Sequence, residues 1–143
     1  MENERERAQK LGYPSPIHQD KAATDLDFNV AAQYCLDNKE TISLLLASHN
    51  EASNLAIAAA MEKLQLPNNY AHIHFSQLYG MGDHITFNMA THGYNVSKYL
   101  PFGPIKEVIP YLMRRAEENS SVNGQTNKEL VMIKAELARR KAK

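Results

Sequence analysis

Two adjacent arginines, Arg114 and Arg115, form the pattern that most directly suggests a binding chemistry. Tyr111 precedes them and Glu118 follows them at offsets of three and four residues, and this spacing places all four side chains along one face of a helix. A guanidinium group keeps its charge and offers planar donors that match both oxygens of a carboxylate. The pattern therefore predicts a carboxylate clamp. It also fits a solvated face on which one arginine pairs with Glu118.

Candidate binding residues lie at or just after the carboxyl ends of three short apolar runs, at 41–47, 71–77 and 94–100. These runs have the length and composition of strands, and the first is expected to be buried on both faces. In α/β folds ligands bind at the carboxyl ends of the strands. The candidate residues at those ends are Ser48, His49, Asn50, Gln77, Leu78, Tyr79, Gly80 and Tyr99.

Several of these polar residues also have structural explanations. Asn50 is well placed to cap the helix that follows it, and His49 to satisfy a nearby backbone group. His72 and His74 lie two apart on a predicted strand, so both project to one face and could hold zinc. No third ligand is evident at the end of that strand, and ordinary surface histidines are the alternative.

The elements that must position these residues alternate between strand and helix. Helices are predicted at 2–11, from Thr24 or Asp25 to 38, at 51–64, at 83–91, from Pro104 onward and at 127–143, with a polar loop at 119–126. Pro110 should bend the fifth helix or delay its start. Strands joined by helices predict parallel pairing, in a doubly wound sheet or a barrel. No G-x-G-x-x-G motif follows a strand, which disfavours the dinucleotide-binding version. Three strands are few for a free-standing parallel sheet, so the chain is expected to be part of something larger.

Composition excludes several classes of function. The chain has 143 residues, 43% of them hydrophobic, with 16 basic and 16 acidic side chains. A net charge of zero predicts no general attraction to nucleic acid or to an anionic membrane. The apolar runs are too short to span a bilayer, and the charged first ten residues lack the core of a secretory signal. Cys35 is the only cysteine, so an internal disulfide is impossible.

Four segments of the chain resemble the proline dehydrogenase family in residues, order and spacing. They are 47–51 (ASHNE), 75–81 (FSQLYGM), 98–104 (KYLPFGP) and 111–119 (YLMRRAEEN). The last two combine into Y-x-P-x-G followed by Y-L-x-R-R-x-x-E-N, which is hard to obtain by chance. The resemblance extends over nearly the whole chain.

The resemblance implies a distorted (βα)8 barrel of the TIM type that holds FAD at the carboxyl ends of its strands. Residues 1–143 would be the carboxyl-terminal part of one catalytic domain, with about the last three strands and their helices and with 127–143 as a terminal helix. Family members place a lysine, an aspartate and an arginine-glycine-alanine-tyrosine segment before this region. On that basis the chain is expected to be a fragment that is inactive alone.

The reaction implied is oxidation of L-proline to Δ1-pyrroline-5-carboxylate, with electrons passing through FAD to a quinone. A pyrroline-5-carboxylate dehydrogenase, fused or separate, is the implied metabolic partner. The enzyme would be cytoplasmic and peripheral to the inner membrane in a bacterium, or mitochondrial in a eukaryote. Carried over by residue, the resemblance assigns the proline carboxylate to Arg114 and Arg115, the ring to Tyr99, Tyr111 and Leu78, and the flavin region to Ser48, His49, Asn50 and Glu118.

Two rival functions are also compatible with the sequence. A metal-dependent barrel hydrolase would use His72, His74 and His49 as ligands. A non-catalytic interaction module would bind an acidic partner helix on the Arg114–Arg115 face. Within the main hypothesis, bulky Tyr99 beside the ring predicts a preference for proline over hydroxyproline.

Overall fold

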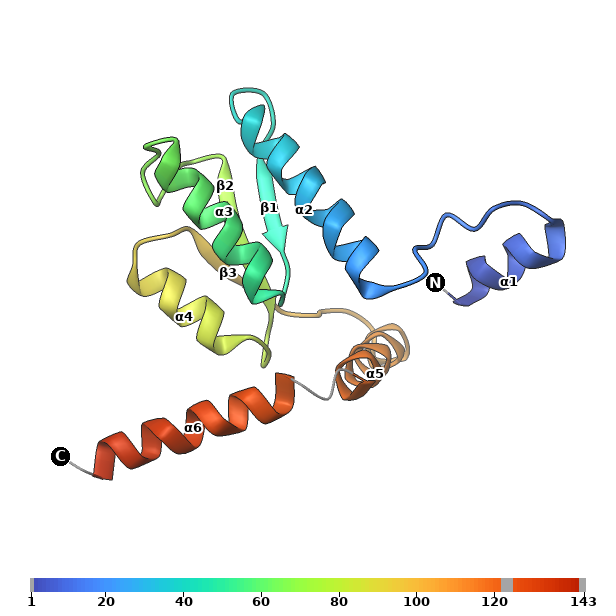
Figure 1. Ribbon diagram of the computed structural model, residues 1–143. Coiled ribbons are helices and arrows are strands. Elements are labelled where there is room, and N and C mark those ends of the chain that lie inside the picture. Colours follow the sequence, from blue (N-terminus) through green and yellow to red (C-terminus); the bar gives the residue numbers. More distant parts are fainter. Residues whose placement is uncertain (1, 122–124, 142–143) are drawn as a thin grey trace. The chain divides into compact units, whose positions relative to one another are not determined.

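The structure is a computed structural model that describes the backbone of residues 2–121 and 125–141 and the side chains of 3–115, 130–135 and 137–141. The chain divides into two compact units, residues 1–98 and 99–143. Figure 1 labels the elements of both units.

The first unit is built on a three-stranded sheet in the order β1-β2-β3, formed by Leu44–Ala47, Ile73–Leu78 and Val96–Tyr99, whose last residue, Tyr99, is the first of the second unit. β1 and β2 are parallel, with Leu46 opposite Phe75. Helices α3 (Glu51–Lys63) and α4 (Asp83–Thr91) connect consecutive strands. The predicted alternation and the parallel first pair are confirmed, although β1 and β3 are shorter than their apolar runs and β2 ends one residue beyond its run.

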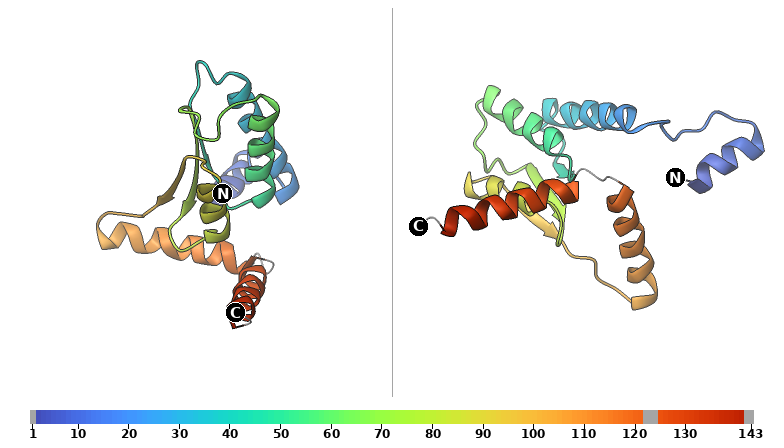
Figure 2. Two further views of the ribbon diagram at one scale, coloured as in Figure 1. Left: turned by 90° about the vertical axis from the view of Figure 1, so that its left-hand side faces the viewer. Right: turned by 60° about the horizontal axis from the view of Figure 1, so that its bottom comes forward.

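One face of this sheet carries the core. Leu46 and Phe75 are register partners and therefore share a face. Side chains from three helices, α2 (Lys21–Asp37), α3 and α4, pack against them in one buried cluster. Figure 2 shows the strands to one side of α2 and α3. The cluster comprises Ala32, Leu36, Leu46, Ile57, Met61, Ile73, Phe75, Ile85 and Met89.

The opposite face of the sheet is exposed at Leu45 and His74, although Ser76 and Leu78, farther along β2 on that face, are buried. Leu45 is 60% exposed, and its register partner His74 is exposed as well. The prediction that the first strand is buried on both faces is therefore wrong for this structure, because all three helices cover the same face. A doubly wound sheet has helices on both faces. The helices that contribute to the buried cluster, α2, α3 and α4, pack on one face only.

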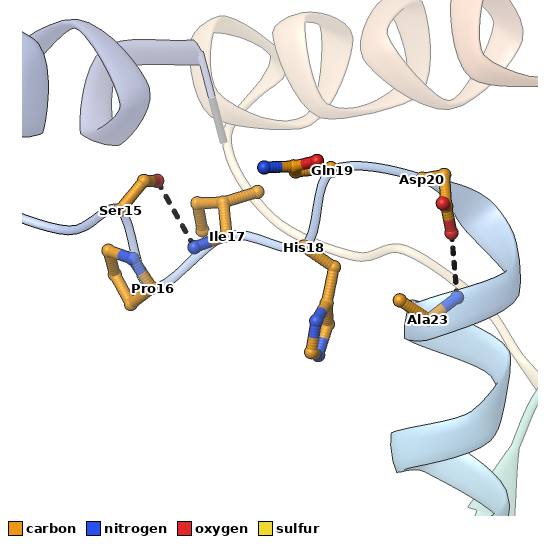
Figure 3. Close-up of a pocket in the computed structure, with 7 residues that line it drawn as sticks. All are labelled: Ser15, Pro16, Ile17, His18, Gln19, Asp20 and Ala23. Atoms are coloured by element: carbon orange, nitrogen blue, oxygen red, sulfur yellow. Dashed lines mark hydrogen bonds between the residues drawn. The ribbon is translucent and has the colours of Figure 1, made fainter.

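Helix α2 begins earlier than the sequence pattern indicated. Its N-cap is Asp20, whose side chain accepts a hydrogen bond from the Ala23 amide at 2.8 Å, so the predicted cap at Thr24 or Asp25 is wrong. An aspartate can satisfy the first free amides of a helix wherever it precedes them. The loop before α2 and its first turn line a hollow of about 400 Å³ that contains none of the predicted site residues (Figure 3).

Helix α1 (Glu2–Leu11) ends at Gly12 as predicted, with φ of +72° at the glycine. Tyr13 then folds back, and its phenol donates a hydrogen bond to Glu4 Oε1 at 2.6 Å. This hydrogen bond, together with desolvation and the charge of Glu4, raises the pKa of Tyr13 above its ordinary value of 10.0. The contact therefore favours the neutral phenol.

The Tyr13–Glu4 contact is expected to weaken in alkali. Since the folded pKa is raised, its stabilisation is complete below pH 10.0 and is lost as pH rises through the folded pKa. Phenolate absorbance can be titrated in the wild type and in Tyr13→Phe, and the difference isolates Tyr13. In a Glu4→Gln variant that difference should move to lower pH. An unmoved difference would contradict the assigned partner.

The second unit contains two helices, α5 (Ile105–Ser121) and α6 (Gln125–Lys141). α5 starts directly after Pro104 and includes Pro110, so Pro110 does not delay its start. The polar loop predicted at 119–126 is wrong at both ends, because α5 continues through Ser121 and α6 begins at Gln125; residues 122–124 lie outside the described part. α6 begins two residues before the predicted 127, and residues 142 and 143 also lie outside. Among the described helices, none is long and apolar enough to cross a membrane.

Candidate functional site

The loop after β1 begins the candidate site in the first unit. Asn50 is the N-cap of α3, and its side-chain oxygen accepts hydrogen bonds from the amides of Ala52 at 3.1 Å and Ser53 at 3.4 Å. The hydroxyl of Ser48 accepts one from the Asn50 amide at 3.1 Å. The predicted capping role of Asn50 is thus confirmed.

His49 joins this loop to the end of β2. Its Nε2 accepts a hydrogen bond from the backbone N–H of Leu78 at 2.9 Å. His49 is half-buried and Leu78 is buried. The predicted bond from His49 to a backbone group is confirmed, and it joins two residues that the sequence had assigned separately to flavin and substrate.

Three buried polar side chains beneath this loop were not recognised as a network from the sequence. Asn54 donates through Nδ2 to the carbonyls of Ser48 at 3.0 Å and Asn50 at 2.8 Å. Gln77 donates through Nε2 to the Ser48 carbonyl at 3.3 Å and to Asn54 Oδ1 at 3.4 Å. Thr86 donates to Gln77 Oε1 at 2.7 Å. Asn54 and Gln77 are each 1% exposed, so the strand ends rest on a hydrogen-bonded layer inside an apolar core.

The turn after β2 fits closely against the same residues. Gly82 has φ of +60°, and a Cβ there would lie 3.3 Å from both His49 Cδ2 and Gln77 Cγ. Lys98 Nζ secures this turn to β3, since it lies 2.6 Å from the Met81 carbonyl and 2.6 Å from Asp83 Oδ1. The turn therefore needs a residue without a side chain next to the His49 ring.

Replacing Gly82 with alanine should therefore disturb His49 as well as the backbone. An alanine at positive φ costs about 1–2 kcal/mol by itself. Gly93 is the matched control, because its φ is +82° and a Cβ there meets nothing within 4 Å. Urea unfolding of both variants gives the difference due to the contact, and Gly82→Ala alone should shift the His49 ring signals in an NMR spectrum. Equal destabilisation with unshifted ring signals would contradict this fit.

The second unit holds an aromatic and cationic cluster. The rings of Tyr99 and Tyr111 meet edge to face, with centroids 6.2 Å apart and planes at 79°. The guanidinium carbon of Arg115 lies 5.4 Å from the centroid of the Tyr111 ring, within cation–π range. The i to i+4 spacing on α5 produces this contact, as the sequence predicted.

The two arginines of the predicted clamp differ in exposure. Arg114 is exposed, whereas Arg115 is half-buried against Tyr111. The side chain of Glu118 lies outside the described residues. The structure thus brings Tyr99, Tyr111 and Arg115 together in one unit, and Ser48, His49, Asn50 and Leu78 in the other.

The histidines of the rival metal site have separate partners. Nδ1 of His72 lies 3.0 Å from the Ser43 hydroxyl, and Nε2 of His74 lies 3.1 Å from the Ala71 carbonyl. β2 begins at Ile73, so the prediction that His72 belongs to the strand is wrong. Within the described residues, no group of three potential ligand side chains could hold a metal ion.

These two clusters have complementary binding properties. The arginine and tyrosine cluster offers a permanent positive charge beside two aromatic rings, which suits a small anion with an apolar body. The strand-end loops offer backbone and side-chain hydrogen-bonding groups at the N-terminus of α3, where a partial positive charge accumulates.

Comparison with known proteins identifies the family. The family described as Proline dehydrogenase matches residues 1–128. The chain is 40% identical over 146 residues to "Proline dehydrogenase 1, mitochondrial" of Caenorhabditis elegans, covering 98% of this chain and 24% of that protein. It is 38% identical both to the human protein of the same name and to "Hydroxyproline dehydrogenase" of Xenopus laevis, of which it covers 24% and 31%. The chain spans less than a third of the length of these relatives, and it belongs to the proline dehydrogenase family.

Proposed function

We propose that this chain contributes the carboxyl-terminal strands of a barrel that oxidises L-proline with FAD. The observation that carries the proposal is the packed cluster of Tyr99, Tyr111 and Arg115 in a member of the proline dehydrogenase family. Proline is a small ring that bears a carboxylate, and the cluster offers one group for each part. The proposed activity is that of a whole enzyme, and this chain would form one part of its structure.

In this proposal the substrate is held by five side chains. Arg114 and Arg115 bind the proline carboxylate through charge-assisted hydrogen bonds. Tyr99 and Tyr111 pack against the ring and exclude water, and buried Leu78 forms an apolar wall. Holding the substrate by its carboxylate fixes where its ring carbon lies, which is the main task of the protein when a cofactor supplies the chemistry.

The strand-end loops of the first unit fit a flavin nucleotide. Ser48 and His49 would hold it, with Asn50 and Glu118 supporting the same region. The fit rests on the polar loop at the N-terminus of α3 and on the close approach that Gly82 permits beside His49. When bound, FAD supplies the acceptor for the hydride removed from the carbon next to the proline nitrogen, and a quinone receives the electrons.

The single helical layer supports the barrel part of the proposal. In a (βα)8 barrel the helices lie outside and the inner face of each strand meets the other strands' side chains. The face that carries Leu45 and His74 would be this inner face. The product, Δ1-pyrroline-5-carboxylate, would pass to a pyrroline-5-carboxylate dehydrogenase. Several relatives have "mitochondrial" in their names, and the proposal accommodates either that compartment or the bacterial inner-membrane surface.

A chimera tests this function directly. These 143 residues would replace the matching segment of the Caenorhabditis elegans relative, which supplies the rest of the protein. The chimera should be yellow, retain FAD through gel filtration and reduce a dye when proline is added. The 143-residue chain alone should show none of these three properties. A colourless folded chimera would contradict the flavin proposal, and an active holo-protein formed by the chain alone would contradict the need for further strands.

Substrate selectivity is expected to depend on Tyr99. Because the chain is as similar to a hydroxyproline dehydrogenase as to a proline dehydrogenase, overall identity does not distinguish the substrates. In the chimera, Tyr99→Ser should raise kcat/KM for hydroxyproline relative to that for proline by about 10- to 100-fold, since a removed steric conflict is worth 1–3 kcal/mol. Tyr34→Ser on α2 is the control. An unchanged ratio for Tyr99→Ser would show that Tyr99 does not line the ring pocket.

A further inference from the structure

We propose that Gln77, Asn54 and Thr86 are positioning residues that hold His49 as a neutral imidazole with its proton on Nδ1. The functional meaning rests on the proposed contact between His49 and FAD. The geometric claim does not, because it concerns hydrogen bonds within the chain. Gln77 was a candidate at a strand end, but none of the three residues was assigned a role toward substrate or cofactor.

The orientation of both buried amides follows from their partners. Gln77 Nε2 faces two acceptors, the Ser48 carbonyl and Asn54 Oδ1. Asn54 Nδ2 also faces two carbonyls, those of Ser48 and Asn50. Of the two ends of a side-chain amide, only the NH₂ group can donate a hydrogen bond to an oxygen acceptor. Gln77 Oε1 must then face Thr86, whose hydroxyl donates to it at 2.7 Å. The two amides therefore have a single consistent orientation, and the Thr86 hydroxyl also lies 3.2 Å from the Gly82 carbonyl.

This arrangement acts on both residues of the His49–Leu78 hydrogen bond. The Ser48 carbonyl, which directly precedes His49, accepts from both amides. Gln77 directly precedes Leu78, whose N–H is bound by His49 Nε2 at 2.9 Å. Buried polar groups are costly to leave unpaired, so this buried network resists small shifts of either strand end. The distance between the His49 ring and Leu78 is held from both sides.

The Leu78 hydrogen bond determines the protonation of the ring. Nε2 can accept an N–H only through its lone pair. A proton on Nε2 would place two donors against each other. The proton of the neutral ring must therefore lie on Nδ1, and His49 would enter the flavin region without a charge. A tautomer fixed by the partner of the other nitrogen is a common way to set what a histidine offers a ligand.

The test uses Thr86, because its hydroxyl can be removed without changing the side-chain shape. In the wild-type chain, ¹⁵N NMR should show His49 in the Nδ1–H form and a protected Leu78 amide. Thr86→Val should make the Leu78 amide exchange at least about fivefold faster, since Gln77 Oε1 loses its donor, and should mix the tautomers of His49. Thr86→Ser should restore both signals. Thr91→Val is the matched control, since the Thr91 hydroxyl donates to the carbonyl of Phe87 four residues earlier, just as the Thr86 hydroxyl lies 3.2 Å from that of Gly82.

Three outcomes would overturn the proposal. These are a wild-type His49 that carries its proton on Nε2, a Leu78 amide without protection, and a Thr86→Val variant indistinguishable from Thr91→Val. None of the readouts requires flavin. If His49→Ala leaves the flavin content of the chimera unchanged, the cofactor role of His49 fails while the measured tautomer still decides the positioning claim.

Discussion

Replacing Arg115 with methionine is expected to raise the KM for proline about a hundredfold or more in the chimera. In the proposed site the guanidinium makes two charge-assisted hydrogen bonds to the proline carboxylate, each worth about 1.5–3 kcal/mol. Since 1.36 kcal/mol corresponds to a factor of ten, losing both gives at least this change. Methionine removes the guanidinium beside Tyr111 but keeps an unbranched apolar side chain of good helix propensity, so the helix should remain folded. Steady-state kinetics with proline and a dye acceptor measure the effect.

Conservative and remote variants distinguish a clamp from general charge. Arg115→Lys should recover only part of the affinity, because an ammonium group cannot match both carboxylate oxygens. Arg114→Met should raise KM in the same direction. Arg7→Met, which removes an exposed charge from α1, is the control. An unchanged KM in both Arg114→Met and Arg115→Met would remove the proline clamp and favour the interaction module, in which this face binds an acidic partner helix.

Replacing Phe75 with alanine is expected to unfold most of the first unit near physiological temperature. Phe75 is 0% exposed and meets Tyr94 edge to face, with ring centroids 5.6 Å apart. Truncating a buried phenylalanine costs about 3–5 kcal/mol, a large share of the 5–15 kcal/mol that stabilises a whole small domain. The Tm should fall by roughly 12–40 °C, at 4–8 °C per kcal/mol for a domain of this size. Thermal and urea unfolding followed by circular dichroism provide the measurement.

Phe87 supplies the matched control for this substitution. It is the same residue type on α4 but is 65% exposed, so Phe87→Ala should change the free energy of unfolding by no more than about 0.5 kcal/mol. If Phe75→Ala were no more destabilising than Phe87→Ala, the sheet face that carries Phe75 could not be the core. The assignment of one covered and one partly exposed face would then be wrong.

The sequence alone determined the elements whose signals are local. Helix α4 has the predicted bounds, α3 ends one residue before its predicted end, and Asn50 caps α3 as expected. Capping residues, turn glycines and helical periodicity act within a few positions of the chain. The Tyr111–Arg115 contact was equally predictable, because it joins neighbours on one helix. The family was evident from the motifs around His49, Leu78 and Arg114, and comparison confirmed it.

Only the tertiary structure decided which groups are buried and which strand face is covered. Nothing local distinguishes Leu45 from Leu46, yet one is 60% exposed and the other 1%, because only one face meets α2, α3 and α4. Asparagine and glutamine are mostly surface residues. Asn54 and Gln77 are buried here, and Gln77 bonds Asn54 and Ser48, which lie 23 and 29 positions away in the chain. The partner of His49 also lies 29 residues away. Local periodicity selects helices and strands, whereas the buried polar network depends on packing between distant segments.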